Sequence, residues 1–291
     1  MRRESGSRPR LTLFVAALLT ALLASLALAA LAGADAISPQ AGPTKNAVDT
    51  DTLYKIVFGM GVAVLALVWG ILFYTLFRYR ARRGREAPQI RGNTPLELGW
   101  TGAAVALVTA IAIVTFIFLG GIKNPVASGP GGLAQARVEN AAINQPAPPG
   151  GRALSIKVGG QQYFWRYQYP NGAVSFHDLV VPKDTTVTLE ITSNDVAHSW
   201  WIPELGPKFD AIRGLTNETW FKATKTGTFV GQCAEYCGTN HYAMTAKVIV
   251  LEPAAYQKWV ADQKKEIAAA REAVAKERKQ IQGDITASGS G

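Results

Sequence analysis

The chain has 291 residues, 48% of them hydrophobic, and a formal net charge of +9. A basic excess can indicate nucleic-acid binding, but here it lies in the N-terminus, one short loop and the C-terminal tail. Residues 151–262 carry about equal numbers of basic and acidic side chains. We therefore expect no nucleic-acid partner. The charge pattern instead indicates a protein that spans a membrane, with its basic residues outside the spanning segments.

The first element in chain order is an apolar segment, residues 11–31, which follows several arginines. It ends in Ala32-Gly33-Ala34, a run of small residues that suits cleavage by signal peptidase. Residues 1–34 are therefore predicted to be a cleaved signal peptide. The alternative is an uncleaved membrane anchor, because the apolar stretch is long for a signal peptide.

Two further segments, residues 56–77 and 98–119, contain no charged side chain. At about 1.5 Å per residue each is long enough to cross a bilayer, and a single central charge would cost about 2.5–3.5 kcal/mol. The loop between them is rich in arginine, which keeps such a loop in the cytoplasm. Residues 50–122 are predicted to form a transmembrane hairpin whose outer ends are exported; a soluble helix pair is the alternative.

The polar half of the chain divides into three parts. Residues 123–152 are rich in Gly, Pro and Ala and are predicted to be a linker. Residues 153–253 contain short β-branched and aromatic runs separated by turns, the pattern of a small antiparallel sandwich with Greek-key connections. Residues 254–291 are predicted to be a helical tail with an apolar residue at every seventh position. We expect the tail to dock on a partner; a solvated helix is the alternative.

One stretch near the end of the sandwich, GQCAEYCGTNHYAM, contains soft metal ligands. Cys233 and Cys237 are followed by His241 and Met244, and His198 lies in a separate segment, DVAHSW. Thiolate, imidazole and thioether groups together favour copper. Two cysteines suggest two coppers that share bridging sulfurs, and such a centre would transfer electrons.

Three other interpretations of these residues remain open. The cysteines could form a disulfide, which is common in exported domains but needs neither His nor Met. A zinc site would use Cys and His but rarely Met. A mononuclear blue-copper site would use His, Cys, His and Met and leave one cysteine unexplained. The two-copper interpretation uses every ligand type present.

These motifs resemble subunit II of the haem–copper cytochrome c oxidases, from the helix hairpin to about Trp259. The pattern C-x-E-x-C-x-x-x-H-x-x-M spans residues 233–244, DVAHSWWIPELGPKFDAIRG resembles the family's upstream ligand segment, and NTPLELGWT resembles the start of its second helix. The resemblance implies a transmembrane hairpin followed by an all-β cupredoxin-like sandwich, here with a helical tail. It also implies a location in the bacterial inner membrane, with the metal domain on the exported side.

The resemblance further implies a dinuclear copper A centre. Cys233 and Cys237 would bridge both coppers, with His198 and Met244 on one copper, and His241 and the backbone carbonyl of Glu235 on the other. In the family, this glutamate's carboxylate also reaches a Mg²⁺ at the junction with subunit I, and an oxygen ligand suits that cation.

The aromatic segment GGQQYFWRYQY resembles the strand where electrons enter in the family. This chain has Tyr163 where the family usually has Trp, so Tyr163 or Trp165 is the predicted point where electrons enter. The acidic residues that attract a basic cytochrome c are few here, with Gln168 and Asn171 at two of the expected positions. We therefore expect a donor that is less basic or is bound less by charge steering.

The resemblance implies that the chain accepts electrons from a c-type cytochrome and passes them to haem in subunit I, where oxygen is reduced to water. Subunit I, subunit III and the cytochrome would be its partners. The alternatives are a copper A subunit of a nitric oxide reductase, a copper-free quinol oxidase subunit II, and a membrane-anchored structural sandwich with a disulfide.

Overall fold

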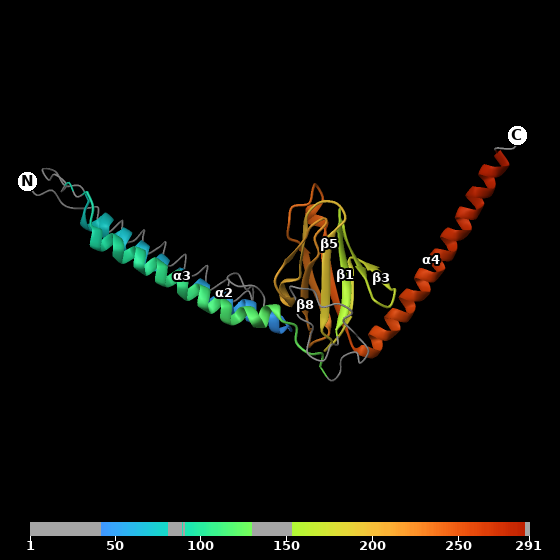
Figure 1. The fold of residues 1–291 in the computed structure, drawn as a ribbon, viewed down its shortest axis with the longest axis horizontal. Helices are drawn as coiled ribbons and strands as arrows, with labels where there is room; N and C mark the ends of the chain where they lie inside the picture. Colours follow the sequence, from blue (N-terminus) through green and yellow to red (C-terminus); the bar gives the residue numbers. More distant parts are fainter. Residues whose placement is uncertain (1–41, 81–88, 90, 130–152, 289–291) are drawn as a thin grey trace, which may run out of the picture. The chain divides into compact units, whose positions relative to one another are not determined.

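The structure is a computed structural model that describes residues 42–80, 89, 91–129 and 153–288 (Figure 1). The predicted signal peptide, residues 1–34, lies outside the described residues, as does most of the predicted linker. Three parts follow one another in the described chain: a pair of long helices, a β-sandwich and a C-terminal helix.

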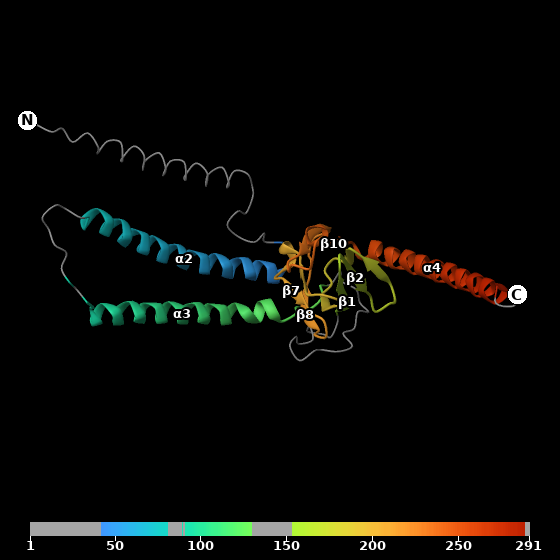
Figure 2. The ribbon, with the colours of Figure 1, turned by 90° about the horizontal axis from the view of Figure 1, so that it is seen from above.

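The two helices are α2, Lys45–Arg78, and α3, Thr94–Lys123, which lie side by side and contact each other (Figure 2). Helix α3 has a reciprocal N-terminal cap: the Asn93 side chain accepts a hydrogen bond from Leu96 N, and Glu97 Oε1 accepts one from Asn93 N. Both helices are long and apolar enough to cross a membrane, and many of their large apolar side chains are exposed.

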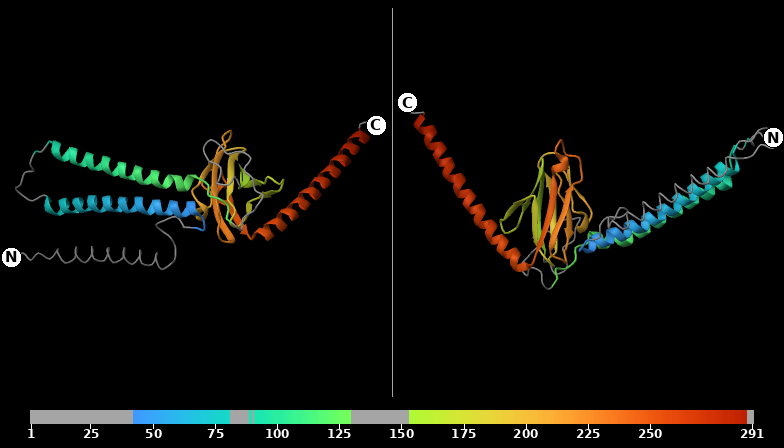
Figure 3. Two further views of the ribbon diagram at one scale, coloured as in Figure 1. Left: turned by 60° about the horizontal axis from the view of Figure 1, so that its bottom comes forward. Right: turned by 180° about the vertical axis from the view of Figure 1, so that it is seen from behind.

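The sandwich contains ten strands in two five-stranded sheets, which form two layers (Figures 1 and 3). The first sheet has the order β3-β2-β1-β5-β8 and the second the order β4-β10-β9-β6-β7. The strand bounds are as follows: β1 Leu154–Gln161, β2 Phe164–Gln168, β3 Val174–Phe176, β4 Asp178–Pro182, β5 Val187–Ser193, β6 His198–Trp201, β7 Phe209–Ala211, β8 Asn217–Phe221, β9 Gly227–Cys233 and β10 Thr245–Leu251.

The cupredoxin-like sandwich fold is confirmed, but the prediction of purely antiparallel sheets was wrong. Strands β1 and β5 pair in parallel in the first sheet, and β4 and β10 do so in the second. Each of these pairs joins strands that other strands separate in the chain, so the connection is long enough to return the chain in the same direction. The neighbouring pairs are antiparallel.

The core lies between the two sheets and follows the alternation of the strands. In β5 every second side chain is buried, and β10 shows the same period of two. The largest buried side chains include Trp165, Tyr167 and Phe221, which are at most 1% exposed. This alternation gives the sandwich an apolar interior, and the candidate site lies at one end of it.

The C-terminal helix α4, Pro253–Ser288, begins against the sandwich. Tyr256 and Val260 are buried, and the Trp259 ring packs on Tyr169 with ring centroids 5.1 Å apart. Beyond these first turns the described side chains of α4 are mostly exposed, including Val274 and Ile281. The start of the tail is therefore part of the domain, while its apolar stripe continues into solvent.

Candidate metal centre

The ends of three inner strands meet at one end of the second sheet and supply three of the predicted ligands. His198 is the first residue of β6, Cys233 is the last residue of β9, and Met244 immediately precedes β10. Because β9 is antiparallel to both of its neighbours, the end of β9 lies beside the starts of β6 and β10. The N–H of Cys233 donates to the carbonyl of Met244 at 2.9 Å, which fixes two of these residues against each other.

The loop after β9 brings the other two side-chain ligands to the same place. Cys237 lies on this loop, and His241 begins the short 3₁₀ helix η2, His241–Ala243. The N–H of His241 donates to the carbonyl of Gly238 at 3.0 Å, and that of Met244 donates to the carbonyl of His241 at 3.2 Å. These hydrogen bonds close the loop into a compact turn above the strand ends.

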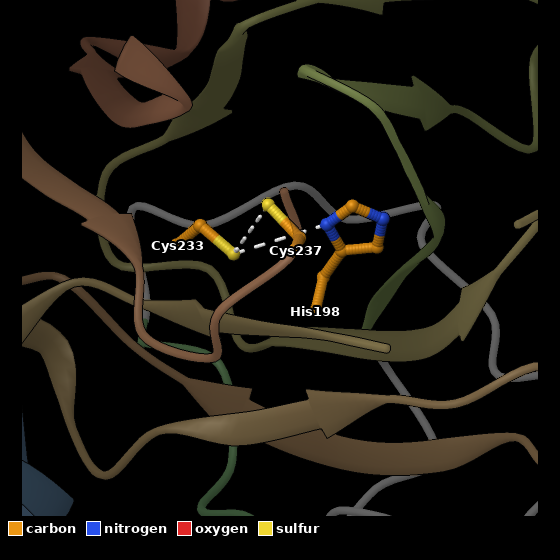
Figure 4. Close-up of side chains that lie close together, drawn as sticks. All are labelled: His198, Cys233 and Cys237. Atoms are coloured by element: carbon orange, nitrogen blue, oxygen red, sulfur yellow. Dashed lines mark hydrogen bonds between the residues drawn. The ribbon is translucent and has the colours of Figure 1, made fainter. Parts of the chain in front are cut away.

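The five predicted side chains form one cluster in which the donor atoms face one another. Cys233 Sγ lies 3.9 Å from Cys237 Sγ and 3.8 Å from His198 Nδ1 (Figure 4). Cys237 Sγ lies 3.5 Å from His241 Nδ1 and 3.8 Å from Met244 Sδ. His198 and Met244 are fully buried and both cysteines are at most 3% exposed. The ring nitrogen that faces the sulfurs is Nδ1 in both histidines.

Glu235 points its backbone and its side chain in different directions. Its backbone carbonyl lies 3.2 Å from Cys233 Sγ, inside the cluster, while its side chain is exposed. One residue therefore presents a neutral oxygen to the sulfurs and a carboxylate to the outside.

The imidazole of His198 is held on two further sides. Its Nε2 lies 2.8 Å from Asp195 Oδ1, and its ring meets the edge of the Trp165 ring with centroids 5.9 Å apart. Gly160 passes so close that an added Cβ would lie 3.0 Å from His198 Cδ2. A side chain at this position would therefore crowd the ring.

The surroundings of the two thiols in the cluster give them different pKa values. Burial opposes ionisation of Cys233, but its hydrogen bonds with His198 and with the backbone of Glu235 lower its pKa to about 7. Burial and the charge of Cys233 raise the pKa of Cys237 to about 11. Burial alone would lower the pKa of His198, yet its hydrogen bonds to Cys233 and Asp195 raise it. In the metal-free cluster Cys233 therefore ionises near neutral pH, while Cys237 stays protonated there.

The donor set fits a soft transition metal. Both cysteines are free, and their sulfurs lie about twice as far apart as in a disulfide. His198, Cys233 and Cys237 place one ligand atom each within 4.8 Å of one another. Two imidazole nitrogens, two thiols and a thioether sulfur are the ligands that copper accepts, and the thioether is a poor ligand for zinc.

The two residues predicted as the point where electrons enter differ in their exposure to solvent. Trp165 is fully buried and lies against His198, so it presents no surface to a donor. Tyr163 is partly exposed, and its hydroxyl lies 2.6 Å from the position of an added Cβ on Gly238. Tyr163 thus covers the ligand loop from outside. His177 is exposed on the turn between β3 and β4.

Sequence reasoning missed Asp195, Gln162 and Gly160. Asp195 precedes His198 by three residues in the turn SNDVAH, and that spacing was the available signal for it. Gln162 and Gly160 lie in the segment GGQQY, whose contact with the ligand loop exists only in the folded chain.

Two buried thiols, one buried and one half-buried imidazole, and a buried thioether lie at one end of the sandwich. This arrangement is that of a cupredoxin-like domain with a candidate metal site, here preceded by two apolar helices. Residues 174–252 match the family model described as "Cytochrome C oxidase subunit II, periplasmic domain". The chain is 33% identical over 231 residues to cytochrome c oxidase subunit 2 of Alkalihalophilus pseudofirmus, covering 76% of this chain and 62% of that protein. It is also 33% identical over 241 residues to the subunit 2 of Thermostichus vulcanus, covering 72% and 73%.

Among solved structures, the periplasmic domain of subunit II of cytochrome oxidase from Bradyrhizobium japonicum is similar. It shares 37% identity, covers 39% of this chain and 94% of that chain, and has a TM-score of 0.38. The chain belongs to the cytochrome c oxidase subunit II family.

Proposed function

We propose that the chain is the electron-accepting subunit of a terminal cytochrome c oxidase. It would take electrons from a c-type cytochrome at a dinuclear copper A centre and relay them to haem in subunit I, where oxygen is reduced to water. The observation that carries the proposal is the cluster at the ends of β6, β9 and β10, in which two free thiols, two imidazole Nδ1 atoms and a thioether sulfur face one another.

Two copper ions bound there would supply one-electron redox chemistry. Cys233 and Cys237 would hold both ions through their sulfurs, His198 and Met244 would complete one, and His241 and the Glu235 carbonyl the other. Metal ligation requires both thiols to be deprotonated. Cys233 is poised for this by its pKa of about 7, whereas Cys237 must lose its proton on binding.

Electrons would enter through Tyr163. Its ring is partly exposed and its hydroxyl approaches Gly238, directly after the ligand Cys237. Exposed apolar side chains in the same loops include Val196, Tyr236 and Tyr242. These side chains favour a donor contact that is largely apolar, with weaker charge steering than an acidic surface would give. Trp165 would support the His198 ring from the interior.

The membrane arrangement follows from the helices and the arginine-rich loop between them. Helices α2 and α3 would span a bacterial inner membrane, with the arginine-rich loop in the cytoplasm and the metal domain on the exported side. Subunits I and III would be the partners in the membrane. The exposed Glu235 carboxylate would reach a Mg²⁺ shared with subunit I, because a carboxylate oxygen is a suitable ligand for this hard cation.

The comparisons favour none of the alternatives. The relatives reported above carry the name of the cytochrome c oxidase subunit. A copper-free quinol oxidase subunit would have no use for the full ligand set that this chain retains. A structural sandwich with a disulfide disagrees with the two free cysteines.

The proposal is tested by metal analysis of the purified full-length complex. We expect about two coppers per chain and a mixed-valence spectrum. Cys233→Ser and Cys237→Ser should each abolish that spectrum, because a hydroxyl cannot replace a bridging thiolate. Thr239→Ser, in the same loop, is the matched control and should leave the spectrum unchanged. A copper-free complex, or a normal spectrum in either cysteine variant, would contradict the proposal.

A further inference from the structure

The turn between β1 and β2 contacts both halves of the candidate centre, although its residues contribute no ligand. Gln162 lies in this turn and is exposed. Its side-chain Nε2 donates to the carbonyl of Cys237 at 2.6 Å, and its backbone N–H donates to Asp195 Oδ2 at 2.8 Å. An exposed glutamine usually bonds to water, so two hydrogen bonds to the surroundings of the centre suggest a defined role.

Asp195 joins this turn to the ligand His198. Oδ2 of the carboxylate accepts from Gln162 N, while Oδ1 lies 2.8 Å from His198 Nε2 and accepts from Val196 N at 2.7 Å. The outer nitrogen of the imidazole therefore faces a carboxylate that is itself held by the turn. Partners of this kind orient a metal-ligating ring and fix which of its nitrogens carries the proton.

Tyr163, the next residue, extends the same turn over the ligand loop. A Cβ added at Gly238 would lie 2.6 Å from Tyr163 Oη and 2.8 Å from Gln162 Nε2. The φ angle of Gly238 is +130°, which L side chains rarely adopt. The bare glycine backbone is thus what lets the turn lie directly on the peptide that follows Cys237.

We propose that Gln162 is a positioning residue that holds Tyr163 against the ligand loop and holds Asp195 against His198. This inference rests on the proposed function, since it gives these contacts a purpose in electron transfer. The Cys237 carbonyl is bound by the side chain and Asp195 by the backbone, so one residue connects the loop-borne ligand to the strand-borne ligand. The Gln162→Ala substitution removes this restraint on the loop but removes none of the proposed ligands.

The experiment compares Gln162→Ala with Gln161→Ala in the full copper-loaded complex. Gln161 is the exposed neighbour at the end of β1 and serves as the matched control. We expect both variants to keep two coppers per chain. Gln162→Ala should change the copper hyperfine pattern and slow reduction by a c-type cytochrome by about 10- to 100-fold, the range found when partners of metal ligands are removed. Gln161→Ala should match the unaltered protein.

A second variant tests the contact between Asp195 and His198. Asp195→Asn keeps the size of the side chain and removes its negative charge beside His198 Nε2. Without that charge the oxidised centre, which is the more positive form, is stabilised less. Its reduction potential should therefore shift to a more positive value, with two coppers still bound.

The outcomes separate this inference from the function on which it rests. A complex without copper in the unaltered protein would refute the proposed function. Full copper loading, with Gln162→Ala identical to Gln161→Ala in hyperfine pattern and reduction rate, would overturn the inference alone.

Discussion

Replacement of Gly160 by alanine tests whether His198 is positioned by its contact with β1. The added Cβ would lie 3.0 Å from His198 Cδ2 and 3.1 Å from Trp165 Cζ3, closer than an ordinary contact of 3.4–4 Å. Both rings are fully buried, so neither can turn aside into solvent. Overpacking of this kind costs about 1–3 kcal/mol. If the copper-bound form carries the whole cost, copper affinity falls by about 5- to 150-fold.

The matched control is Gly159→Ala, one residue earlier on the same strand and on its opposite face. There the added Cβ meets only the Asn194 side-chain amide, at 3.3 Å, which can move. Copper affinity is measured by competition with a chelator, and the environment of the imidazole by the hyperfine pattern. Thermal unfolding of the metal-free, reduced protein shows whether the cost falls on the fold instead. Equal copper affinity, spectrum and stability in the two variants would refute the reasoning.

Three further predictions address the carboxylate, the thiols and the tail. Glu235→Gln should lower the magnesium content and leave copper bound, because copper would use the backbone carbonyl; loss of both metals in elemental analysis would argue against separate roles. In the metal-free protein, alkylation of Cys233 should reach half its maximal rate near pH 7, and that of Cys237 only near pH 11. Equal alkylation profiles for the two thiols would contradict this difference in pKa. Because folding lowers the pKa of Cys233, its ionisation stabilises the fold increasingly as the pH rises from 7 to 9, and this contribution is lost below pH 7. Truncation after Asp262 keeps Tyr256 and Trp259 on the sandwich and removes the exposed stripe, so it should preserve copper and reduce the yield of assembled oxidase; an unchanged yield would show that the stripe has no partner.

The sequence predicted the cluster of candidate ligands because their chemistry is local. Cys233 to Met244 is one loop, and the spacing of soft ligands within it indicates a metal without any knowledge of the fold. The addition of His198 required only that two loops of a sandwich meet at one end. Alternation along the strands predicted the buried faces, but it carries no information on which distant strands pair, so the parallel pairs were missed.

The surroundings of the ligands could not be predicted in the same way. The roles of Gly160 and Gln162 depend on distances of about 3 Å between segments that are far apart in the chain. A glycine pair before an aromatic strand is compatible with many structures, and an exposed glutamine is common on any surface. Asp195 was nearer to prediction, because it is close to His198 in the chain, but the direction of its carboxylate follows from the turn.

The ligands differ in what holds them, and this difference explains why the contacts of the β1–β2 turn matter. His198, Cys233 and Met244 lie at the ends of strands, where the ladder of β6, β9 and β10 fixes their backbone. Cys237 and His241 lie on a loop that has no such ladder. A redox centre needs both groups to keep their places when the charge on the metal changes. The hydrogen bond from Gln162 to the Cys237 carbonyl gives the loop the restraint that the sheet already gives the strands.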